Sequence, residues 1–275
     1  MTTPREQASG DGKIAVVKVG TEMIWVNNDY HVPHMRHICE QIHALREAGW
    51  QTVLVSSGAV AWGREYFRRK EGLVPPKEDE TPQLKQMYAT KGNIPLMNAW
   101  LSCDEQCTQI LTHRPDLRLG HIIDVIRTTL AKNELPIVNG NDAANISELK
   151  YTDNDNLSTR IAAMIRASWH ISLTSTGGIQ GENGKVISFI QPGDGKWLQF
   201  IRHEQSKNGR GGMRRKGRLS AWLADKKGIP ASITGGKEQF LEQRTIEDIL
   251  LNTDTLLRGQ RSVGTTFLPN ILQQS

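Results

Sequence analysis

The sequence predicts an α/β protein, a three-layer α/β/α sandwich with a largely parallel central sheet. Three observations predict it. Short apolar runs alternate along the chain with segments of helical periodicity, as strands joined by crossover helices do. Polar residues and glycines directly follow several of these runs, as at the carboxyl ends of parallel strands. The 275 residues, 37% of them hydrophobic, are enough to bury a substantial core.

Six apolar runs are the predicted strands, at residues 14–19, 52–56, 107–111, 136–138, 170–174 and 229–234. The charged, proline-containing stretch 71–82 predicts an exposed loop before a helix over 83–101. The stretch 177–212 is rich in glycine and polar residues, which predicts a flexible flap with a short hairpin at 185–190.

Three further segments place their apolar residues on one helical face: Met35, Ile38, Ile42 and Leu45; Leu157, Ile161, Met164 and Ile165; and Leu219, Trp222 and Leu223. Gly49 and Gly228 would end the first and the third of these helices, and the second would begin near Asp155.

No internal repeat or compositional shift divides the chain, so we expect a single domain over 13–275 after a disordered tail at 1–12. The sequence has no apolar run of the roughly 18 residues that a membrane span needs, and residues 1–12 are polar. A cytoplasmic location is therefore expected, without a membrane partner.

The formal charge of +5 favours anionic small molecules, and part of the excess lies in residues 210–218. That arginine cluster has no interleaved aromatic residues, so a nucleic-acid partner is not expected. Cys39, Cys103 and Cys107 lack metal-ligand spacing, which predicts reduced structural thiols and no metal site.

Five segments carry the candidate chemistry: VKVGT (17–21), VSSGAVAWG (55–63), PIVNGND (136–142), YTDNDNLS (151–158) and GRGGMRRK (209–216). Lys18 ends a strand just before Gly20 and Thr21, whose backbone N–H groups can face a phosphate. Lys216 lies in a helix that begins after Gly211 and Gly212. Two lysines, with the aspartates Asp142, Asp153 and Asp155 between them, suit phosphoryl transfer onto a carboxylate.

Such a reaction depends on charge more than on a general base. A carboxylate acceptor is already ionised at neutral pH, and none of the eight histidines lies in the five segments. Lysines, Mg²⁺ and oriented N–H groups would bring the two anions together by neutralising phosphate oxygens.

Each segment also has a simpler interpretation. Lys18 alone also fits a lysine snorkelling at a strand end, and Ser57-Gly58 also fits an ordinary loop instead of a carboxylate-binding helix start. The turn at 139–142 needs no ligand, although Asp142 would suit an α-ammonium group. Residues 153–155 suffice as a helix cap. The five segments together favour the functional interpretation.

In their order and spacing, these segments resemble the glutamate 5-kinases of the amino acid kinase family, from about Ile14 to Leu268. The chain is similar to the short form, because it has no room for the C-terminal RNA-modification-type domain of some members. The resemblance implies the amino acid kinase fold and transfer of the γ-phosphoryl of MgATP to the side-chain carboxylate of glutamate, as the first step toward proline. It also implies an amino-acid-binding part at about 13–165, a nucleotide-binding part at about 166–275, and a homodimer or homotetramer.

The resemblance carries roles to matching positions. Lys18 and Lys216 would stabilise the phosphoryl group, and Asp155 would hold both. The positions implied to bind glutamate are Ser57, Gly58, Asp142 and Asn154, supported by Asn139, Asn141 and Asp153. The positions implied to face the nucleotide are Gly20, Thr21, Thr174, Ser175, Gly211, Gly212 and Met213.

The chain departs from the pattern at four single positions and at Gly178-Ile179-Gln180, where the pattern has Gly-Leu-Tyr. Gly140 replaces a glutamate, Ser175 replaces an aspartate, Glu22 replaces a serine or asparagine, and Arg215 replaces a threonine. A solvated Glu22 carboxylate near phosphates would repel them by about 1 kcal/mol, and Arg215 would compensate. Two alternatives stay open: a kinase for another amino acid or carboxylate, and a catalytically impaired protein that binds a metabolite or partner.

Overall fold

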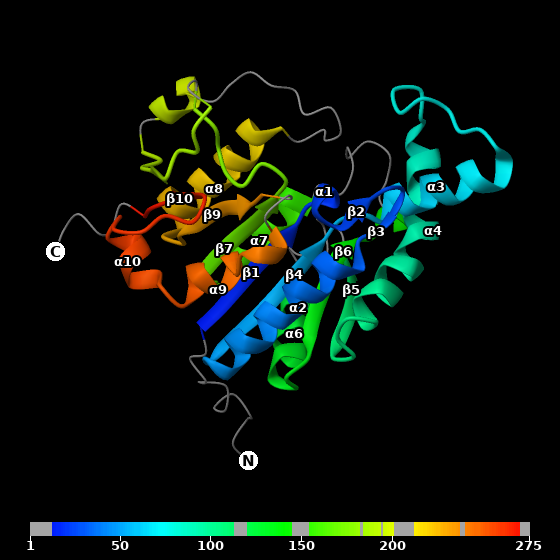
Figure 1. Cartoon of the computed structure of the whole chain (residues 1–275). Coiled ribbons are helices and arrows are strands. Elements are labelled where there is room, and N and C mark those ends of the chain that lie inside the picture. The colour runs from blue at the N-terminus through cyan, green and yellow to red at the C-terminus, as the bar shows by residue number, and fades with distance from the viewer. Residues whose placement is uncertain are drawn as a thin grey trace, which may run out of the picture.

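A continuous eight-stranded sheet runs through the computed structural model of the chain (Figure 1). The structure describes residues 13–112, 120–144, 154–181, 184–193, 195–200, 212–236 and 240–269. The expected tail at 1–12 lies outside these ranges, as do Asp153 and Gly211. The strands are β1 (Lys13–Val19), β4 (Trp50–Ser56), β5 (Cys107–Thr112), β6 (Leu135–Gly140), β7 (Trp169–Thr174), β8 (Phe189–Ile190), β9 (Ala231–Gly235) and β10 (Thr265–Phe267).

The sheet has the strand order β5-β6-β4-β1-β7-β9-β10-β8. The first six strands in this order, from β5 to β9, are mutually parallel. The last two strands, β10 and β8, run in the opposite direction: β10 is antiparallel to β9, and β8 is parallel to β10. All six predicted strands and the largely parallel sheet are confirmed. The central strands are buried on both faces, which is why they read as continuous apolar runs.

Helices cover both faces of this sheet. They are α2 (Val32–Glu47), α3 (Ala59–Glu71), α4 (Pro82–Leu101), α6 (His121–Ala131), α7 (Asn154–Ile165), α8 (Met213–Lys227), α9 (Thr245–Leu250) and α10 (Thr253–Leu257). Thr81 caps α4 by accepting a hydrogen bond from the Leu84 N–H, and Pro82 fits the first helical turn. Gly228 ends α8 in the left-handed conformation, as the sequence predicts.

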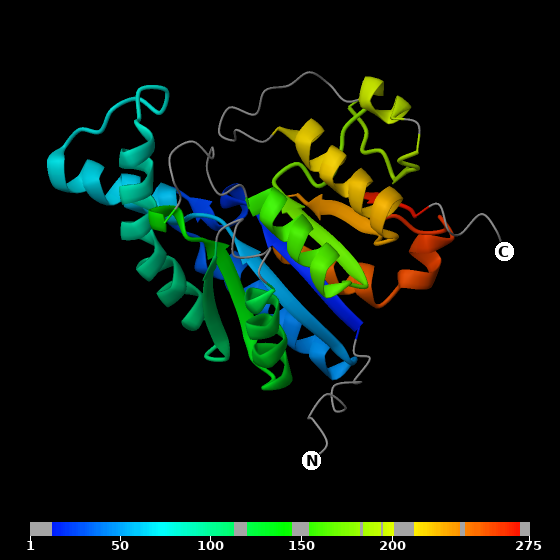
Figure 2. The same ribbon diagram turned by 180° about the vertical axis from the view of Figure 1, so that it is seen from behind.

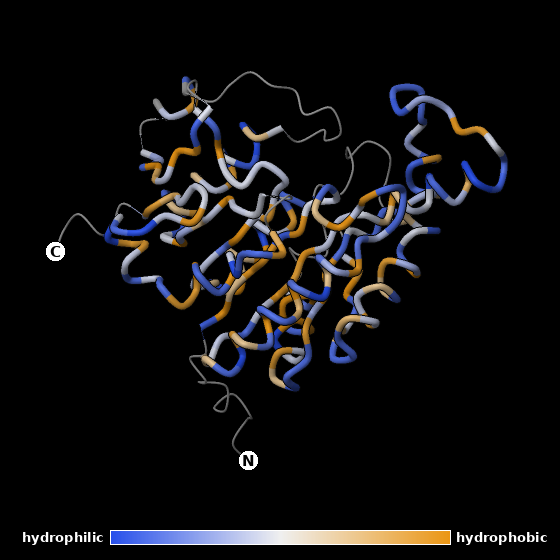
Figure 3. Tube along the Cα trace, viewed as in Figure 1, coloured by the Kyte–Doolittle hydropathy of each residue, from blue (hydrophilic) through white to orange (hydrophobic). Residues whose placement is uncertain are grey.

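Alternate residues of β1 pack into two separate hydrophobic cores, one on each face of the sheet. Val17 and Val19 pack with residues of α2, α4 and α9, whereas Val16 packs with residues of α6, α7 and α8. Figure 2 shows α7 and α8 side by side on the second face, and Figure 3 shows apolar residues following the strands. The expected three-layer α/β/α sandwich is therefore observed.

Two apolar positions of the predicted helical faces are exposed. Met164 in α7 and Trp222 in α8 lie at the surface, so their assignment to buried faces is wrong. Their neighbours Ile161, Ile165 and Leu223 are buried as expected, because they lie on the faces of these helices that pack in the core.

The hairpin expected at 185–190 is also wrong. Phe189–Ile190 pairs in parallel with β10, and Val186 forms one isolated bridge with Gln180. A different hairpin joins β2 (Trp25–Val26) to β3 (Asp29–Tyr30). Its turn is made by Asn27 and Asn28, both at positive φ, which asparagine tolerates.

Helix α3 and the first half of α4 form an antiparallel pair that extends beyond the sheet (Figure 1), whereas Leu96, Met97 and Trp100 of α4 pack in the core. Two glycines allow their close approach: a Cβ at Gly63 would lie 1.9 Å from Tyr88 O, and one at Gly92 would lie 1.8 Å from Ala59 O. Among the described residues, no helix is long and apolar enough to cross a membrane.

Candidate active site

The predicted site residues converge at the carboxyl ends of the parallel strands. Here β1 ends at Val19, β4 at Ser56 and β7 at Thr174. The chain leaves these strands in tight loops: the Ser57 N–H donates to Val19 O, and the Gly20 N–H donates to Leu173 O. The sequence predicted this convergence because polar residues follow each of these strands.

Asp155 joins both predicted lysines. Lys18 Nζ lies 2.7 Å from Asp155 Oδ1, and Lys216 Nζ lies 3.1 Å from Asp155 Oδ2. Lys18 shares the face of β1 that carries Val16, beneath α7 and α8, which supply Asp155 and Lys216. Three elements distant in sequence thus place two ammonium groups on one carboxylate.

The charge balance of this triad holds Asp155 ionised. Burial disfavours the carboxylate, but the ammonium groups of Lys18 and Lys216 outweigh that effect and lower its pKa below the ordinary value. The position of Asp155 in the first turn of α7 adds the favourable helix dipole. With one carboxylate between two ammonium groups, the triad carries a net positive charge that suits an anionic ligand.

A buried histidine lies beneath the triad. His170 in β7 pairs across the sheet with Val16, and its Nε2 lies 3.0 Å from Ser158 Oγ in α7. Burial lowers the pKa of His170 to about 4; Asp155 raises it, and Lys18 lowers it further. The imidazole is therefore neutral at physiological pH and adds no charge next to the lysines.

A network of amides fixes the loop after β6. Asn154 Nδ2 is 2.9 Å from Ser56 O, 3.2 Å from Ser57 Oγ and 2.9 Å from Asn139 Oδ1. Asn139 in turn donates to Asn93 Oδ1 of α4. Asn154 Oδ1 is buried and has no hydrogen-bond partner among the described residues. A ligand N–H group could satisfy such an acceptor.

Asn141 and Asp142 extend this loop. The Asn141 N–H donates to Thr112 O, and Gln86 of α4 donates to the main-chain oxygen of Asp142. Asp142 opens a short 3₁₀ turn, Asp142–Ala144, and is half-buried. Main-chain bonds from two elements therefore fix the backbone that carries the Asp142 carboxylate.

The other side of the triad is lined by backbone and hydroxyl groups. A Cβ at Gly20 would lie 3.2 Å from Leu173 O and 3.7 Å from Lys18 Nζ, so glycine keeps the approach to this ammonium group open. Thr21 begins the short helix α1 (Thr21–Ile24), and Gly212 precedes Met213 at the start of α8. Thr174 Oγ1 lies within 3.4 Å of Thr234 O and of Thr176 Oγ1.

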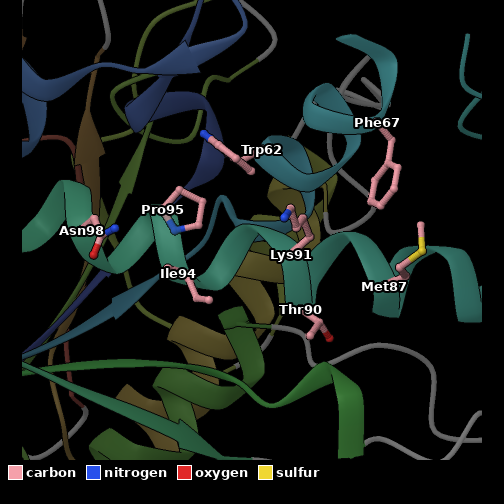
Figure 4. Close-up of a pocket in the computed structure, with 8 residues that line it drawn as sticks. All are labelled: Trp62, Phe67, Met87, Thr90, Lys91, Ile94, Pro95 and Asn98. Carbon is pink, nitrogen blue, oxygen red and sulfur yellow. The ribbon is translucent and has the colours of Figure 1, made fainter. Parts of the chain in front are cut away.

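A groove with a volume of about 670 Å³ lies elsewhere, between α3 and α4 (Figure 4). None of the predicted site residues lines it. Its apolar wall includes Ile94, which is 70% exposed, and Pro95, Trp62 and Phe67. The lysine triad is therefore a separate place in the fold.

The chain is similar to known proteins over nearly its whole length. The profile of the amino acid kinase family matches residues 13–235. A glutamate 5-kinase of Chlorobaculum tepidum is 36% identical over 94% of this chain and 70% of that protein. The chain belongs to the amino acid kinase family. A second family relative, a glutamate 5-kinase of Syntrophus aciditrophicus, is 30% identical over 98% of this chain and 69% of that protein.

The fold agrees with this family. The solved structure of a carbamate kinase from Giardia lamblia bound to AMP-PNP matches with a TM-score of 0.59 at 16% identity, over 94% of this chain and 99% of that protein. At that identity the likeness concerns the fold alone. It confirms the amino acid kinase fold that the sequence predicted.

Two departures from the family pattern contact each other. Ser175 Oγ donates to Glu22 Oε2 at 2.5 Å, linking the end of β7 to α1. A carboxylate from α1 thus lies next to position 175. Sequence reasoning treated Glu22 as an extra carboxylate and Ser175 as a missing one, and it did not predict the pair, because the two residues are 153 positions apart in sequence.

Sequence reasoning missed three further supporting residues. Asn93 and Trp100 lie on the predicted helix 83–101, and Trp100 Nε1 donates to Ser56 Oγ at 2.9 Å. His170 lies inside a predicted strand. A polar residue within an apolar segment was the available signal for Asn93 and His170. Asp153 and Gly211 lie outside the described residues.

Proposed function

We propose that this amino acid kinase uses MgATP to phosphorylate the γ-carboxylate of L-glutamate, forming L-glutamyl 5-phosphate in the first step of proline biosynthesis. The triad Lys18–Asp155–Lys216 carries the proposal. In this reaction a γ-carboxylate oxygen attacks the γ-phosphorus of ATP while the bond to the β,γ-bridging oxygen breaks, and ADP leaves.

The two ammonium groups address the main barrier to this reaction, the repulsion between two anions. Asp155 holds them 2.7 and 3.1 Å from its own oxygens, which pre-organises positive charge at one place. Lys18 is buried, so its field is poorly screened by water. No proton has to leave the acceptor, which agrees with a site whose nearest histidine, His170, is neutral.

The amide network supports binding of an amino acid. Asn154 Oδ1 offers a buried acceptor, Asp142 offers a carboxylate, and Ser57 offers a hydroxyl at the start of α3. Acceptors for an ammonium group and donors for a carboxylate are the groups that an α-amino acid needs.

ATP would bind on the side of Gly20, Thr174 and the start of α8. We expect Mg²⁺ to be held mainly by the nucleotide phosphates, because Asp155 is already paired with two lysines. Bound in that way, the ion would neutralise phosphate charge, and the protein would supply the two ammonium groups.

The test is hydroxamate formation with MgATP, hydroxylamine and L-glutamate, with aspartate, 2-aminoadipate and N-acetylglutamate as competing acceptors. We expect hydroxamate with glutamate. Lys216→Ala should lower kcat by about 10²–10³-fold while the circular dichroism spectrum is unchanged. Lys226→Ala, at an exposed position of the same helix, is the matched control and should keep full turnover. Wild-type turnover in Lys216→Ala would refute the assignment.

A second candidate is the same reaction on a related acceptor, and Gly140 favours it. This buried position has no side chain where the glutamate 5-kinase pattern has a carboxylate, and its N–H is bonded to Asn139 Oδ1. Hydroxamate with 2-aminoadipate or aspartate, and none with glutamate, would select this candidate. The homo-oligomer implied by the resemblance stays a prediction, which light scattering tests.

A further inference from the structure

A second cluster of reactive side chains lies at the opposite edge of the sheet from the lysine triad. Cys39 lies on α2, and His43 lies one helical turn further along. Asp104 and Cys107 lie in the connection from α4 to β5, where Cys107 is the first strand residue. Because β5 is parallel to its neighbours, its first residue marks the amino edge of the sheet.

The ligand atoms of three of these side chains are close together and shielded from solvent. Cys39 Sγ, Cys107 Sγ and a carboxylate oxygen of Asp104 all lie within 4.8 Å of one another. These residues are 1%, 6% and 6% exposed. His43 Nε2 is 3.2 Å from Asp104 Oδ2, and the His43 side chain is 47% exposed. Three of the side chains are therefore buried, and one half-exposed imidazole lies beside them.

Asp104 is the observation that points to a ligand. Its Oδ1 accepts a hydrogen bond from the Gln106 N–H. Its Oδ2 is buried, and no hydrogen bond within the described part of the chain reaches it; the His43 contact lacks hydrogen-bond geometry. A buried carboxylate oxygen without a donor costs free energy unless a cation compensates it.

We propose that Cys39, His43, Asp104 and Cys107 form a binding site for Zn²⁺. Two thiolates, one imidazole and one carboxylate are a four-ligand set that suits tetrahedral Zn²⁺, and the sulfur atoms disfavour Mg²⁺ and Ca²⁺. Binding exchanges the two thiol protons for the ion and releases them to solvent. The ion would bind Asp104 Oδ2 and join α2 to the start of β5.

The third cysteine supplies a matched control. Cys103 Sγ contacts Ala99 O at 3.3 Å within its own helix and is not among the clustered ligand atoms. Sequence spacing did not reveal the site, because Cys39 and Cys107 come from separate elements and the other two ligands are an aspartate and a histidine.

The test uses the full-length chain, freed of metal by dialysis against a chelator and kept reduced. Co²⁺ serves as a spectroscopic substitute for Zn²⁺, without nucleotide. We expect one equivalent of Co²⁺ to give sulfur-to-cobalt charge-transfer absorption and the d–d bands of tetrahedral Co²⁺. Zn²⁺ should displace the Co²⁺ and raise the Tm of the protein. Cys107→Ala and His43→Ala should each weaken Zn²⁺ binding at least about tenfold, whereas Cys103→Ala should match the wild type.

Three outcomes would overturn the site. The first is the absence of a charge-transfer band when Co²⁺ is added to the reduced wild type. The second is an equal loss of Zn²⁺ affinity in Cys103→Ala and Cys107→Ala. The third is a Cys39–Cys107 disulfide in freshly purified protein that binds no Zn²⁺ after reduction. If Cys107→Ala fails to fold, the proposal is still tested by the cobalt spectrum of the wild type and by His43→Ala, which changes a half-exposed side chain.

Discussion

Glu22 and Ser175 are each unusual alone and complementary as a pair. The Ser175 hydroxyl donates to the Glu22 carboxylate across the entrance between α1 and the end of β7. A short O–H···O⁻ bond of this kind is stronger than a neutral one. The bond therefore orients the half-buried Glu22 carboxylate and satisfies one of its oxygens.

Exchanging the two side chains tests whether they act as a unit. Ser175→Asp alone would place two carboxylates in contact and should lower the free energy of unfolding by about 1–2 kcal/mol. Glu22→Ser combined with Ser175→Asp should recover most of that loss, because a single carboxylate then faces a single hydroxyl. Urea unfolding measures the free energy of unfolding of the single and the double variant. MgADP titration shows whether nucleotide affinity changes in the same way. Additive effects of the two substitutions would contradict the pairing.

His170 makes stability depend on pH. Its pKa in the folded state is about 4, below its ordinary value of 6.5, so the unfolded chain binds the proton first as the pH falls. We expect the free energy of unfolding to fall by up to about 1.4 kcal/mol per pH unit from pH 6.5 to 4. Asp155, whose pKa is lowered, adds its own loss only further into acid.

Urea unfolding across this pH range measures the slope, and His170→Gln should lose most of it. The Ser158 hydroxyl would keep a polar neighbour in that variant, so its stability at pH 7 gives the baseline. An unchanged slope in His170→Gln would mean that other groups cause the acid sensitivity.

At the scale of elements, the α3–α4 pair depends on two glycines. Gly92→Ala would drive a methyl group into the main chain at Ala59, where only 1.8 Å is available. Although alanine favours helix, we expect this overpacking to lower the free energy of unfolding by about 1–3 kcal/mol, and more if the helices cannot separate. Thermal unfolding measures the loss. Thr90→Ala, at an exposed position of the same helix, should change Tm little.

Most elements were predictable because their patterns are local. The strands of residues 14–19 and 170–174 are continuous apolar runs, since both faces of a parallel strand are buried. The hairpin at Asn27–Asn28 and the pairing of Phe189–Ile190 with β10 were not predicted. Two-residue strands leave almost no periodicity, and their partners are chosen by the rest of the fold.

The same distinction holds for the candidate site. Lys18, Asp155 and Lys216 could be placed from strand ends, helix starts and the family resemblance, and the structure brings them together. The hydrogen bond from Asn139 to Asn93 and the Glu22–Ser175 pair could be recognised only in the folded structure. Such contacts join residues far apart in sequence, so no spacing rule contains them.

At the scale of the whole molecule, the expected amino-acid-binding part (13–165) and nucleotide-binding part (166–275) share one sheet. In the strand order, the boundary falls between β1 and β7, which pair in parallel from Ala15–Trp169 to Val19–Leu173. Helix α7 of the first part packs with α8 of the second in a common core. The triad crosses the same boundary, since Lys216 belongs to the second part and its partners to the first.

We therefore expect both parts to unfold as one cooperative unit. Separating β1 from β7 would expose the buried side chains of Trp169 and Ile171. It would also separate Lys216 from its partner Asp155. Hydrogen exchange of β4 and β9 peptides in a urea series measures this: both should open at the same urea concentration, coincident with the loss of helical circular dichroism. MgADP should raise both midpoints equally, because a ligand that binds only the folded state stabilises every part of a cooperative unit. If β9 opened first and only its midpoint moved with MgADP, the nucleotide-binding part would be a separate folding unit, and the triad would be a contact between domains.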